Sequence, residues 1–546
     1  MKIRNILTSI ALVMIGAMSS IQAQVYLNYY GARENGYIPL DEIDSVTIGP
    51  STSGLVAQLA NDPSASLYYA ALQVTGLDTL IDNSSYDENY NNTDYPFYYY
   101  TSDFWREVAT APDYKIQGYT LFVTPDQVFQ AYGIFNLRDL VLKAKSIYDM
   151  TYPEDAGLYD DDFTHPKNPL NRFMRYTILT CDVKDLNRLA GLIVNQGVVN
   201  GVLGVKTHLL NPTDWYQTLL PGTLMKCEQL TMGEYKGNGN INDFYINRRY
   251  DADCAIEGTH ISRTLPQLNL TPYNGHYYYV DDIVAFTNDV RDRVQNTRIR
   301  MDFSTVFPEL TTLDIRQNGD PTKDDNSAVA DVTFQNGRNY YFPEGFLDGV
   351  TLRTPTMFIY RRPHWNFWCY QGDEFVIPGY YDIEFRLPPV PFSGTWQVRL
   401  GYCVSDTRGV AQVYFDGIPQ GSPLDMCVLL ADESILGSAF YDNPYTSMTD
   451  EEKAKEQKLL KDKGFYRAPF GSYYSDGNVI NDFVDNYRTI RRVLCETYID
   501  NTKEHYLRLQ CLPGVYQSIL GMQLDYIELV PKSVYDVPEG EMEDDL

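Results

Sequence analysis

The sequence contains 546 residues, of which 44 are Lys or Arg and 72 are Asp or Glu, so its formal net charge is −28 at pH 7. So acidic a surface repels phosphate backbones and anionic membranes, which argues against a nucleic-acid partner. A chain of this length is expected to form roughly two to four domains. Its 46 tyrosines suit both the strands of a β-rich protein and recognition surfaces.

Residues 1–23 have the pattern of a secretory signal peptide, in which a short basic start precedes an apolar run at residues 6–18. We expect cleavage after Ala23. The apolar run is too short to span a bilayer and no later stretch is long and apolar enough, so no transmembrane segment is predicted. The first cysteine is Cys181, which leaves none beside the cleavage point for a lipid anchor. We therefore expect an extracytoplasmic protein that is periplasmic, at the cell surface or secreted.

The segments that follow predict a small β unit, then helices, then a loop. Residues 24–52 indicate a short N-terminal β segment with an Asn-Gly hairpin turn. Residues 53–81 carry leucines at helical intervals, which predicts helices. Residues 82–100 are polar and rich in tyrosine, and we interpret them as an insertion loop.

Residues 119–140 combine a strand, a corner and a helix. The aromatic and β-branched run Tyr119–Val123 predicts a strand. The residue before Pro125 is biased toward an extended conformation, and Pro125 itself is tolerated at the first position of a helix. Asp126 is favourable at the positive end of that helix, and Phe129 occupies its apolar face.

This strand, the Thr-Pro-Asp corner and the helix that carries Phe129 resemble the first signature of the fasciclin (FAS1) domain. Residues 171–180 resemble the second signature, with Tyr176 in the position of its tyrosine and Thr177 in place of its histidine. The Asn-Gly turn at residues 274–275, which leads into a strand, resembles the closing strand of the domain.

The resemblance implies a FAS1-like domain of bacterial type, with mixed α/β structure, over residues 53–297, enlarged by insertions. In the family the Tyr-His pair is associated with core hydrogen bonding and, in animal members, with adhesion-receptor binding. Because Thr177 replaces the histidine, the resemblance implies the fold more strongly than the receptor role.

From residue 298 onward, short segments of alternating apolar and polar residues dominate, with a turn every ten or so residues. This pattern is typical of half-buried antiparallel strands and predicts a β-sandwich over residues 298–535. Within it, residues 449–464 predict a surface helix, polar on both faces, that begins with a Thr-Glu capping box. Residues 536–546 predict a disordered acidic tail.

Four of these segments, at residues 395–402, 413–417, 504–511 and 524–531, resemble strands of galactose-binding-like jelly rolls, a group that includes carbohydrate-binding modules. The Leu-Asp-Tyr-Ile run in the last segment is similar to the closing strand of such modules. The predicted fold class is therefore multidomain α+β, with a FAS1-like mixed α/β domain followed by an antiparallel β-sandwich of jelly-roll type.

The sequence holds no recognised catalytic pattern. It has no Gly-x-Ser-x-Gly elbow and no phosphate-binding loop, and its six histidines lack the spacing of metal ligands. The chain is therefore predicted not to be an enzyme, although its many acidic residues leave a glycosidase pair open. The eight cysteines are compatible with disulfides and equally with buried free thiols.

An aromatic cluster in residues 361–370 is the candidate ligand site. Sugars stack their C–H faces on exposed aromatic rings, and Trp365, Trp368 and Tyr370 are candidates for such stacking. The alternative is that these side chains belong to the core of the sandwich, as large aromatic residues usually do.

The jelly-roll resemblance also implies a structural calcium ion near the chain ends. Asp525 matches the aspartate of similar jelly rolls that helps to hold it, and Asp373 or Glu374 is the candidate partner from an earlier strand. The alternative is that Asp525 is a solvated acid at a strand edge. No other cofactor is predicted.

The sequence thus predicts a non-catalytic extracytoplasmic binding or adhesion protein whose partner is a glycan or a cell-envelope protein. One alternative is an accessory subunit of an outer-membrane nutrient-uptake complex. A second alternative is a glycan-active hydrolase.

Overall fold

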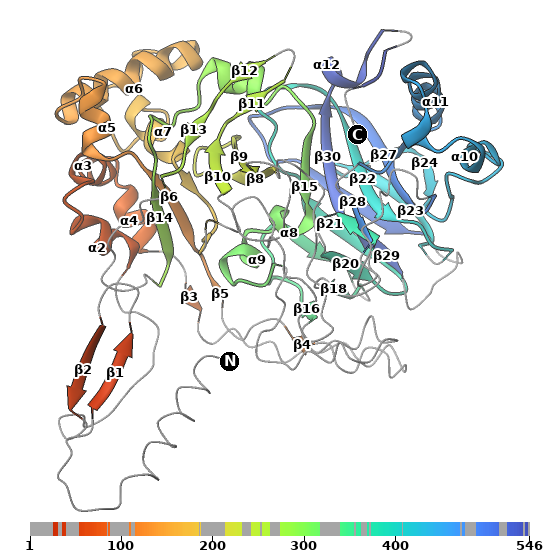
Figure 1. The fold of residues 1–546 in the computed structure, drawn as a ribbon, viewed down its shortest axis with the longest axis horizontal. Coiled ribbons are helices and arrows are strands. Elements are labelled where there is room, and N and C mark those ends of the chain that lie inside the picture. Colours follow the sequence, from red (N-terminus) through yellow and green to blue (C-terminus); the bar gives the residue numbers. More distant parts are fainter. Residues whose placement is uncertain are drawn as a thin grey trace, which may run out of the picture.

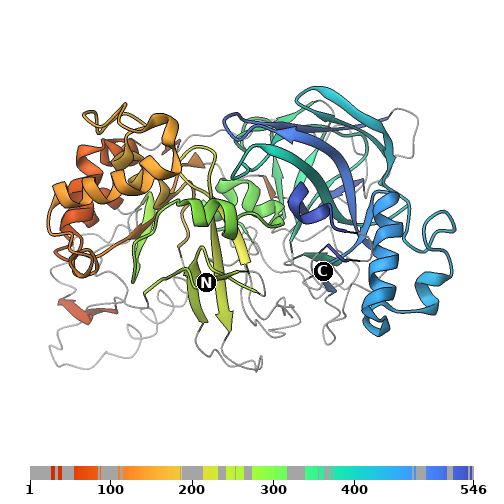
Figure 2. The same cartoon turned by 90° about the horizontal axis from the view of Figure 1, so that it is seen from above.

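The structure of the chain is a computed structural model that describes residues 26–30, 35–39, 54–83, 86–87, 109–110, 115–184, 186, 213–231, 242–251, 254–262, 273–316, 339–353, 356–361, 368–370, 373–406, 408–469, 472–474, 487–512, 521–538 and 541–543. The predicted signal peptide with its cleavage point and most of the predicted loop at residues 82–100 lie outside the described residues. The helices of the first third of the chain gather on one side of the molecule, and the large β-sheets lie on the other side together with the blue helices of the C-terminal part (Figures 1 and 2).

Two clusters of buried hydrophobic side chains organise the described residues. One runs in sequence from Leu55 to Val290, and we call it the helical core. The other, which we call the sandwich core, is formed mainly by residues from Ile299 to Leu529. The predicted class, in which helices and antiparallel sheets are combined in one chain, agrees with this arrangement.

The helical core is surrounded by short helices and a small mixed sheet. The helices are α2 (Leu55–Ala60), α3 (Ser66–Val74), α4 (Leu77–Asp82), α5 (Asp126–Ala131), α6 (Leu137–Thr151) and α7 (Pro169–Tyr176). The sheet has the strand order β14 (Gly275–Tyr279), β6 (Tyr119–Val123) and β7 (Ile178–Leu179). Strand β6 is buried along its whole length, pairs in parallel with β14 and antiparallel with β7, and is therefore the centre of this half.

The predicted strand, corner and helix at residues 119–140 are confirmed. Strand β6 ends at Val123, Pro125 is the extended residue before α5, and the helix begins at Asp126. Asp126 lies in the first turn of α5, as predicted, and its Oδ1 also accepts a hydrogen bond from the backbone N–H of Leu67 at 2.9 Å, in the first turn of α3. Asp126 thus stabilises the start of a neighbouring helix and ties two segments together.

A second sheet connects the helical core to the sandwich core. Its strand order is β13 (Thr259–His260), β10 (Asn242–Ile246), β9 (Leu224–Thr231) and β8 (Thr213–Gln217). Successive side chains of a strand point to opposite faces. On β8, Trp215 accordingly packs into the sandwich core and Tyr216 into the helical core, and Leu224 and Met225 of β9 divide in the same way. The two cores therefore share this sheet.

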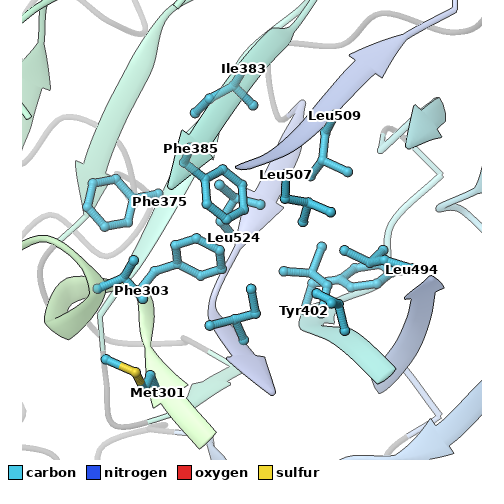
Figure 3. Close-up of a cluster of buried hydrophobic side chains, with 14 of the residues drawn as sticks. Met301, Phe303, Phe375, Ile383, Phe385, Tyr402, Leu494, Leu507, Leu509 and Leu524 are labelled. Carbon is cyan, nitrogen blue, oxygen red and sulfur yellow. The ribbon is translucent and has the colours of Figure 1, made fainter. Parts of the chain in front are cut away.

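Three sheets of the described strands enclose the sandwich core, and nearly all of their pairs are antiparallel, as predicted. The first has the order β15 (Ile299–Asp302), β30 (Tyr526–Pro531), β22 (Gly394–Cys403), β27 (Thr489–Ile499) and β25 (Phe465–Arg467). The second has the order β29 (Met522–Leu524), β20 (Glu374–Ile377), β18 (Phe358–Arg361), β16 (Tyr340–Phe342) and β4 (Ala109–Thr110). The third has the order β17 (Val350–Leu352), β21 (Asp382–Arg386), β28 (Tyr506–Cys511), β23 (Val410–Phe415) and β24 (Ile418–Asp425). Inward-facing side chains from these sheets meet in one layer (Figure 3).

The sheets of the sandwich join segments that are distant in the sequence. Strand β4, from the first half of the chain, pairs in parallel with β16. Strand β15 pairs with β30, which is close to the end of the sequence. Tyr526 of β30 lies opposite Gly401 of β22, where a Cβ atom would be 2.0 Å from the tyrosine ring. The absence of a side chain at Gly401 is therefore what lets that ring lie across the strand.

The remaining elements are short, apart from one helix. They are the strand pairs β1 (Tyr26–Tyr30) with β2 (Asn35–Pro39), β3 (Tyr86–Asp87) with β5 (Lys115–Ile116), β11 (Arg249–Tyr250) with β12 (Ala255–Ile256) and β19 (Trp368–Tyr370) with β26 (Ser472–Tyr474), and the helices α8 (Phe303–Val306), α9 (Pro308–Thr312), α10 (Ala439–Asp442), α11 (Asp450–Asp462) and α12 (Lys532–Tyr535). Helix α11 has the predicted capping box of Thr449 and Glu452. Contrary to the prediction that both faces are polar, it buries Ala454, Gln457 and Leu460.

The acidic tail also differs from the prediction. Within its described residues, Glu543 is 1% exposed and forms ion pairs with Arg298 and Arg399. Composition alone predicted disorder, because the arginines that hold this glutamate are far away in the sequence. Among the described side chains, seven cysteines are free thiols, at positions 181, 227, 254, 403, 427, 495 and 511. None of the helices in the described part is both long and apolar enough to cross a bilayer.

Candidate functional site

Of the three aromatic residues predicted to stack on a sugar, the structure describes only the side chain of Tyr370. Trp365 lies outside the described residues, and the side chain of Trp368, in β19, does as well. Tyr370 is only 4% exposed, and its ring centroid lies 5.0 Å from that of Tyr526. The guanidinium carbon of Arg300 lies 5.7 Å from the centroid of the Tyr370 ring. Tyr370 is therefore a packing residue of the sandwich, in line with the alternative weighed for it.

The predicted calcium ligands Asp373, Glu374 and Asp525 are buried, and all of their carboxylate oxygens except Oε2 of Glu374 accept from protein donors. Both carboxylate oxygens of Asp525 accept from the backbone N–H of Tyr370, at 2.8 and 2.9 Å. Glu374 forms an ion pair with Arg361.

Asp373 accepts hydrogen bonds from the hydroxyls of Tyr360 at 2.8 Å and Ser304 at 3.3 Å. Among the described residues, no group of three or more His, Cys, Asp or Glu side chains is arranged to hold a metal ion. The predicted set therefore does not fit a calcium ion. It differs from the alternative too, since Asp525 is not a solvated acid at a strand edge.

These acids instead form a buried electrostatic cluster with Asp302. Burial, and then the charge of Asp373, raises the pKa of Asp302 well above its ordinary value. Burial, and then the charge of Asp302, likewise raises the pKa of Asp525 well above its ordinary value. The cluster therefore retains protons at pH values where exposed aspartates are ionised.

A different set of side chains forms a continuous polar surface on the sandwich. Strands β21, β28 and β23 alternate strictly along much of their length. Their inward members include Ile383, Phe385, Leu507 and Leu509, which point into the core in Figure 3. By the two-residue period of a strand, the intervening residues point to the opposite side. We call this set the polar sheet face, and its members are Asp382, Glu384, Gln412, Tyr414, Arg508 and Gln510.

The register of the three strands arranges the polar sheet face in two rows. Gln510 of β28 lies opposite Asp382 of β21 on one side and opposite Gln412 of β23 on the other. One step along, Arg508 lies between Glu384 and Tyr414. Directly opposite side chains in antiparallel strands are close enough to interact, so the six residues form one continuous surface.

Hydrogen bonds hold the side chains of this face in fixed orientations. Arg508 donates from Nε and Nη2 to the two carboxylate oxygens of Asp382, each at 2.7 Å, a bidentate arrangement with defined geometry. Gln510 Nε2 donates to Asp382 Oδ2 at 3.2 Å, and its Oε1 accepts from the hydroxyl of Tyr414 at 3.0 Å. The Arg508 guanidinium carbon lies 4.9 Å from the centroid of the Tyr414 ring.

The face is partly exposed and nearly balanced in charge. The side chain of Arg508 is 22% exposed, and its hydrogen bond to Asp382 raises the pKa of the guanidinium, which stays charged. Tyr414, Gln412 and Gln510 are intermediate in exposure. At the rim, Arg353 pairs with Glu384, and Arg386 pairs with Asp348 and Glu504, so each arginine here has an acidic partner. Such a surface offers donors, acceptors and an aromatic ring without a dominant charge.

Sequence reasoning missed the polar sheet face even though it identified the strands. The signal was present, since Tyr, Arg, Gln and Asp occupy alternate positions of three segments. What the sequence lacked was the strand order, because only the pairing of β21 with β28 and of β28 with β23 brings the three sets side by side.

No family model matches the chain, and no curated protein matches it. Among solved structures, a family 35 carbohydrate-binding module from Clostridium thermocellum is 9% identical over 34% of this chain and 88% of its own, with a TM-score of 0.17. The CBM35 of Paenibacillus barcinonensis is 11% identical over 35% of this chain and 97% of its own, with a TM-score of 0.17. A Paenibacillus xanthan lyase is 14% identical over 33% of this chain, with a TM-score of 0.19, and the match spans 12% of the lyase.

Proposed function

We propose that this protein binds a glycan through the polar sheet face and does not chemically alter it. The observation that carries the proposal is the hydrogen-bonded set of Tyr414, Arg508, Asp382 and Gln510 on one side of three adjacent strands. Sugars require an aromatic surface for their C–H groups together with fixed polar groups for their hydroxyls, and this set supplies both. Because the side chains are already held in place, little conformational entropy is lost when a ligand binds.

The acidic side chains of the polar sheet face are paired with neighbouring side chains, and this favours a binding role over hydrolysis. A glycosidase needs one carboxyl that donates a proton and a second that acts as a base or nucleophile. Asp382 already accepts hydrogen bonds from Arg508 and Gln510, and Glu384 is paired with Arg353. Both carboxylates are thus engaged in holding the side chains of the face in place.

The N-terminal half is proposed to be a FAS1-like platform for adhesion on an extracytoplasmic protein. The support is the strand–corner–helix of β6 and α5, the parallel pair of β6 with β14, and the environment of Tyr176. The hydroxyl of Tyr176 donates to the carbonyl oxygen of Leu224 at 3.2 Å, as expected of a core tyrosine. Thr177, in place of the family's histidine, is within 2.7 Å of the hydroxyl of Tyr68. Fractionation of the producing cells tests the location.

The test of glycan binding uses the full chain on a glycan array, followed by titration with the best ligand. Tyr414→Ala is expected to weaken binding roughly fivefold to tenfold, because it removes the stacking ring. Gln510→Ala is expected to weaken it by a similar factor through the loss of a hydrogen bond. Tyr498→Ala is the matched control, since Tyr498 is 63% exposed on β27 of another sheet.

Equal binding by the Tyr414→Ala and Tyr498→Ala chains would contradict the assignment of the face. Chromatography of the glycan after long incubation with the protein should show no shorter products. Product release that disappears on replacing one acid would instead establish the hydrolase alternative.

A further inference from the structure

The glutamate near the end of the sequence is held as a bound ligand would be. Oε1 of Glu543 accepts from Arg298 Nη2 at 2.5 Å and from Arg399 Nη1 at 2.7 Å, and Oε2 accepts from Arg399 Nη2 at 2.8 Å. The backbone N–H of Glu543 donates to Oε1 of Gln457 at 2.7 Å. We call Arg298, Arg399 and Gln457 the carboxylate clamp.

The clamp is built from parts of the sandwich that do not depend on the tail. Arg399 belongs to β22, in the middle of its sheet, and Arg298 immediately precedes β15. Gln457 is a buried residue of α11, which packs beside β25. Gln397 accepts from Nε of Arg399 at 3.0 Å and from its Nη2 at 2.7 Å, so the guanidinium is oriented without Glu543.

In the described part of the chain, four arginines around the clamp share two buried glutamates. Glu528 lies within 4 Å of four guanidinium groups, those of Arg298, Arg300, Arg399 and Arg491. Glu528 and Glu543 are the acids that form ion pairs with these arginines in the described residues. A buried charge without a partner is costly, so loss of Glu543 takes a close carboxylate away from Arg399 and favours another anion in its place. The arginines hold the pKa of Glu543 down, at about 2, so its carboxylate is ionised at neutral pH.

In the described residues of the tail, 536–538 and 541–543, the buried attachment is Glu543. Of the described residues after Tyr535, Glu543 is the buried one, whereas Glu541 is exposed and Met542 is half-buried. A segment with few buried contacts, as in this described part of the tail, opens more easily than a packed strand. The clamp therefore favours an anion, and in the described part of the tail Glu543, which fills the clamp, is accompanied by few other buried contacts.

We propose that the carboxylate clamp is a binding site for a glutamate-bearing acidic peptide, filled in this structure by the chain's own tail, and that an acidic segment of a partner protein takes the same place when the tail leaves it. The glutamate carboxylate binds Arg298 and Arg399, and the backbone N–H of the same residue binds Gln457. The clamp lies in a different sheet from the polar sheet face, and this proposal does not depend on glycan binding.

The test uses the full chain with the substitution Glu543→Gln, which removes the charge that occupies the clamp. The probe is a fluorescent synthetic peptide with the sequence of residues 538–546, and its binding is measured by anisotropy. The Glu543→Gln chain should bind the peptide with saturation, at least roughly tenfold more tightly than the unaltered chain does. Adding Arg399→Met to the Glu543→Gln chain should abolish that binding.

The peptide itself provides the matched control. Substitution of Glu543→Gln in the peptide should reduce affinity roughly tenfold or more, whereas Glu541→Gln should leave it within about twofold, since Glu541 is exposed. Equal loss from both peptide substitutions would indicate charge attraction without a site and would overturn the proposal, as would the absence of saturable binding.

If the Glu543→Gln chain does not fold, hydrogen exchange of the unaltered chain serves as the test. Excess peptide should displace the tail and accelerate exchange of the amides of residues 541–543, with little change in the sandwich strands. Unchanged exchange at these amides under saturating peptide would overturn the proposal.

Discussion

At the scale of single residues, the most unusual feature is the set of buried acids around Asp302. Asp302, Asp373 and Asp525 lie within electrostatic reach of one another, and burial and mutual repulsion raise the pKa of Asp302 and of Asp525. The folded protein thus binds protons here more tightly than the unfolded chain does. Stability from this cluster is complete at pH below the ordinary aspartate pKa and falls as the pH rises toward the raised value.

The substitution Asp302→Asn should therefore stabilise the protein at pH 8 by roughly 1–3 kcal/mol and flatten the pH dependence above pH 5. Asn keeps the acceptor that receives the backbone N–H of Ser304 at 2.8 Å, and it is as good a helix cap as Asp. Urea denaturation at pH 5 and pH 8 measures the effect. Asp450→Asn is the control, because its side chain is 90% exposed. Destabilisation by Asp302→Asn at pH 8 would show that the carboxylate is needed in its charged form.

Single residues also show where sequence reasoning reaches its limit. The capping box of Thr449 and Glu452 was predictable because both partners lie within four residues. The burial of Glu543 was not, because its arginine partners lie 144 and 245 residues away. The polar sheet face could not be predicted for the same reason, since its members become neighbours only through strand pairing. Contacts between neighbouring residues could be predicted from the sequence, and contacts between distant segments could not.

At the scale of elements, β22 depends on one glycine. A Cβ atom at Gly401 would be 2.0 Å from the ring of Tyr526 on the neighbouring strand β30, and that ring has little room to move because Tyr526 is buried. Gly401 is thus required by close packing and not by its backbone conformation. The alternation pattern predicted the strand correctly, but it gave no indication that a ring crosses it at this position.

Gly401→Ala should accordingly destabilise the protein by roughly 2–4 kcal/mol, since it overpacks a strand in the middle of its sheet. Gly394→Ala is a control within the same strand, because the nearest atoms to its Cβ position are 3.8 Å away, so it should change stability by less than about 0.5 kcal/mol. Chemical denaturation of both variants provides the comparison. Similar values for the two would mean that Tyr526 moves aside without cost.

At the scale of the whole molecule, the shared sheet makes the two cores interdependent. Trp215 of β8 packs in the sandwich core although it lies well before residue 298, and Tyr216 packs in the helical core. Strand β8 also lies beside β15 and α8. A substitution in β8 should therefore change the packing of both cores.

Trp215→Ala should lower stability by roughly 3–5 kcal/mol through the cavity it leaves. Hydrogen exchange should then accelerate in β15 and β30 of the sandwich as well as in β8 and β9. Tyr250→Ala is the control, since Tyr250 is 59% exposed and should cause little change. Faster exchange confined to the sheet of β8, β9 and β10 would contradict the shared packing.

The pairing of β15 with β30 also affects how the chain is made. Ile299 of β15 lies opposite Leu529 of β30, so β15 can form this pair only after about 230 further residues have been synthesised. At roughly 5–20 residues per second, a ribosome needs on the order of ten seconds or more to deliver that partner. Until then β15 and one side of β22 are unpaired edges of the kind that recruit other chains. We therefore expect the unfinished chain to benefit from protection of these edges, and slower initiation, which spaces the ribosomes on its message, should raise the yield of folded chains.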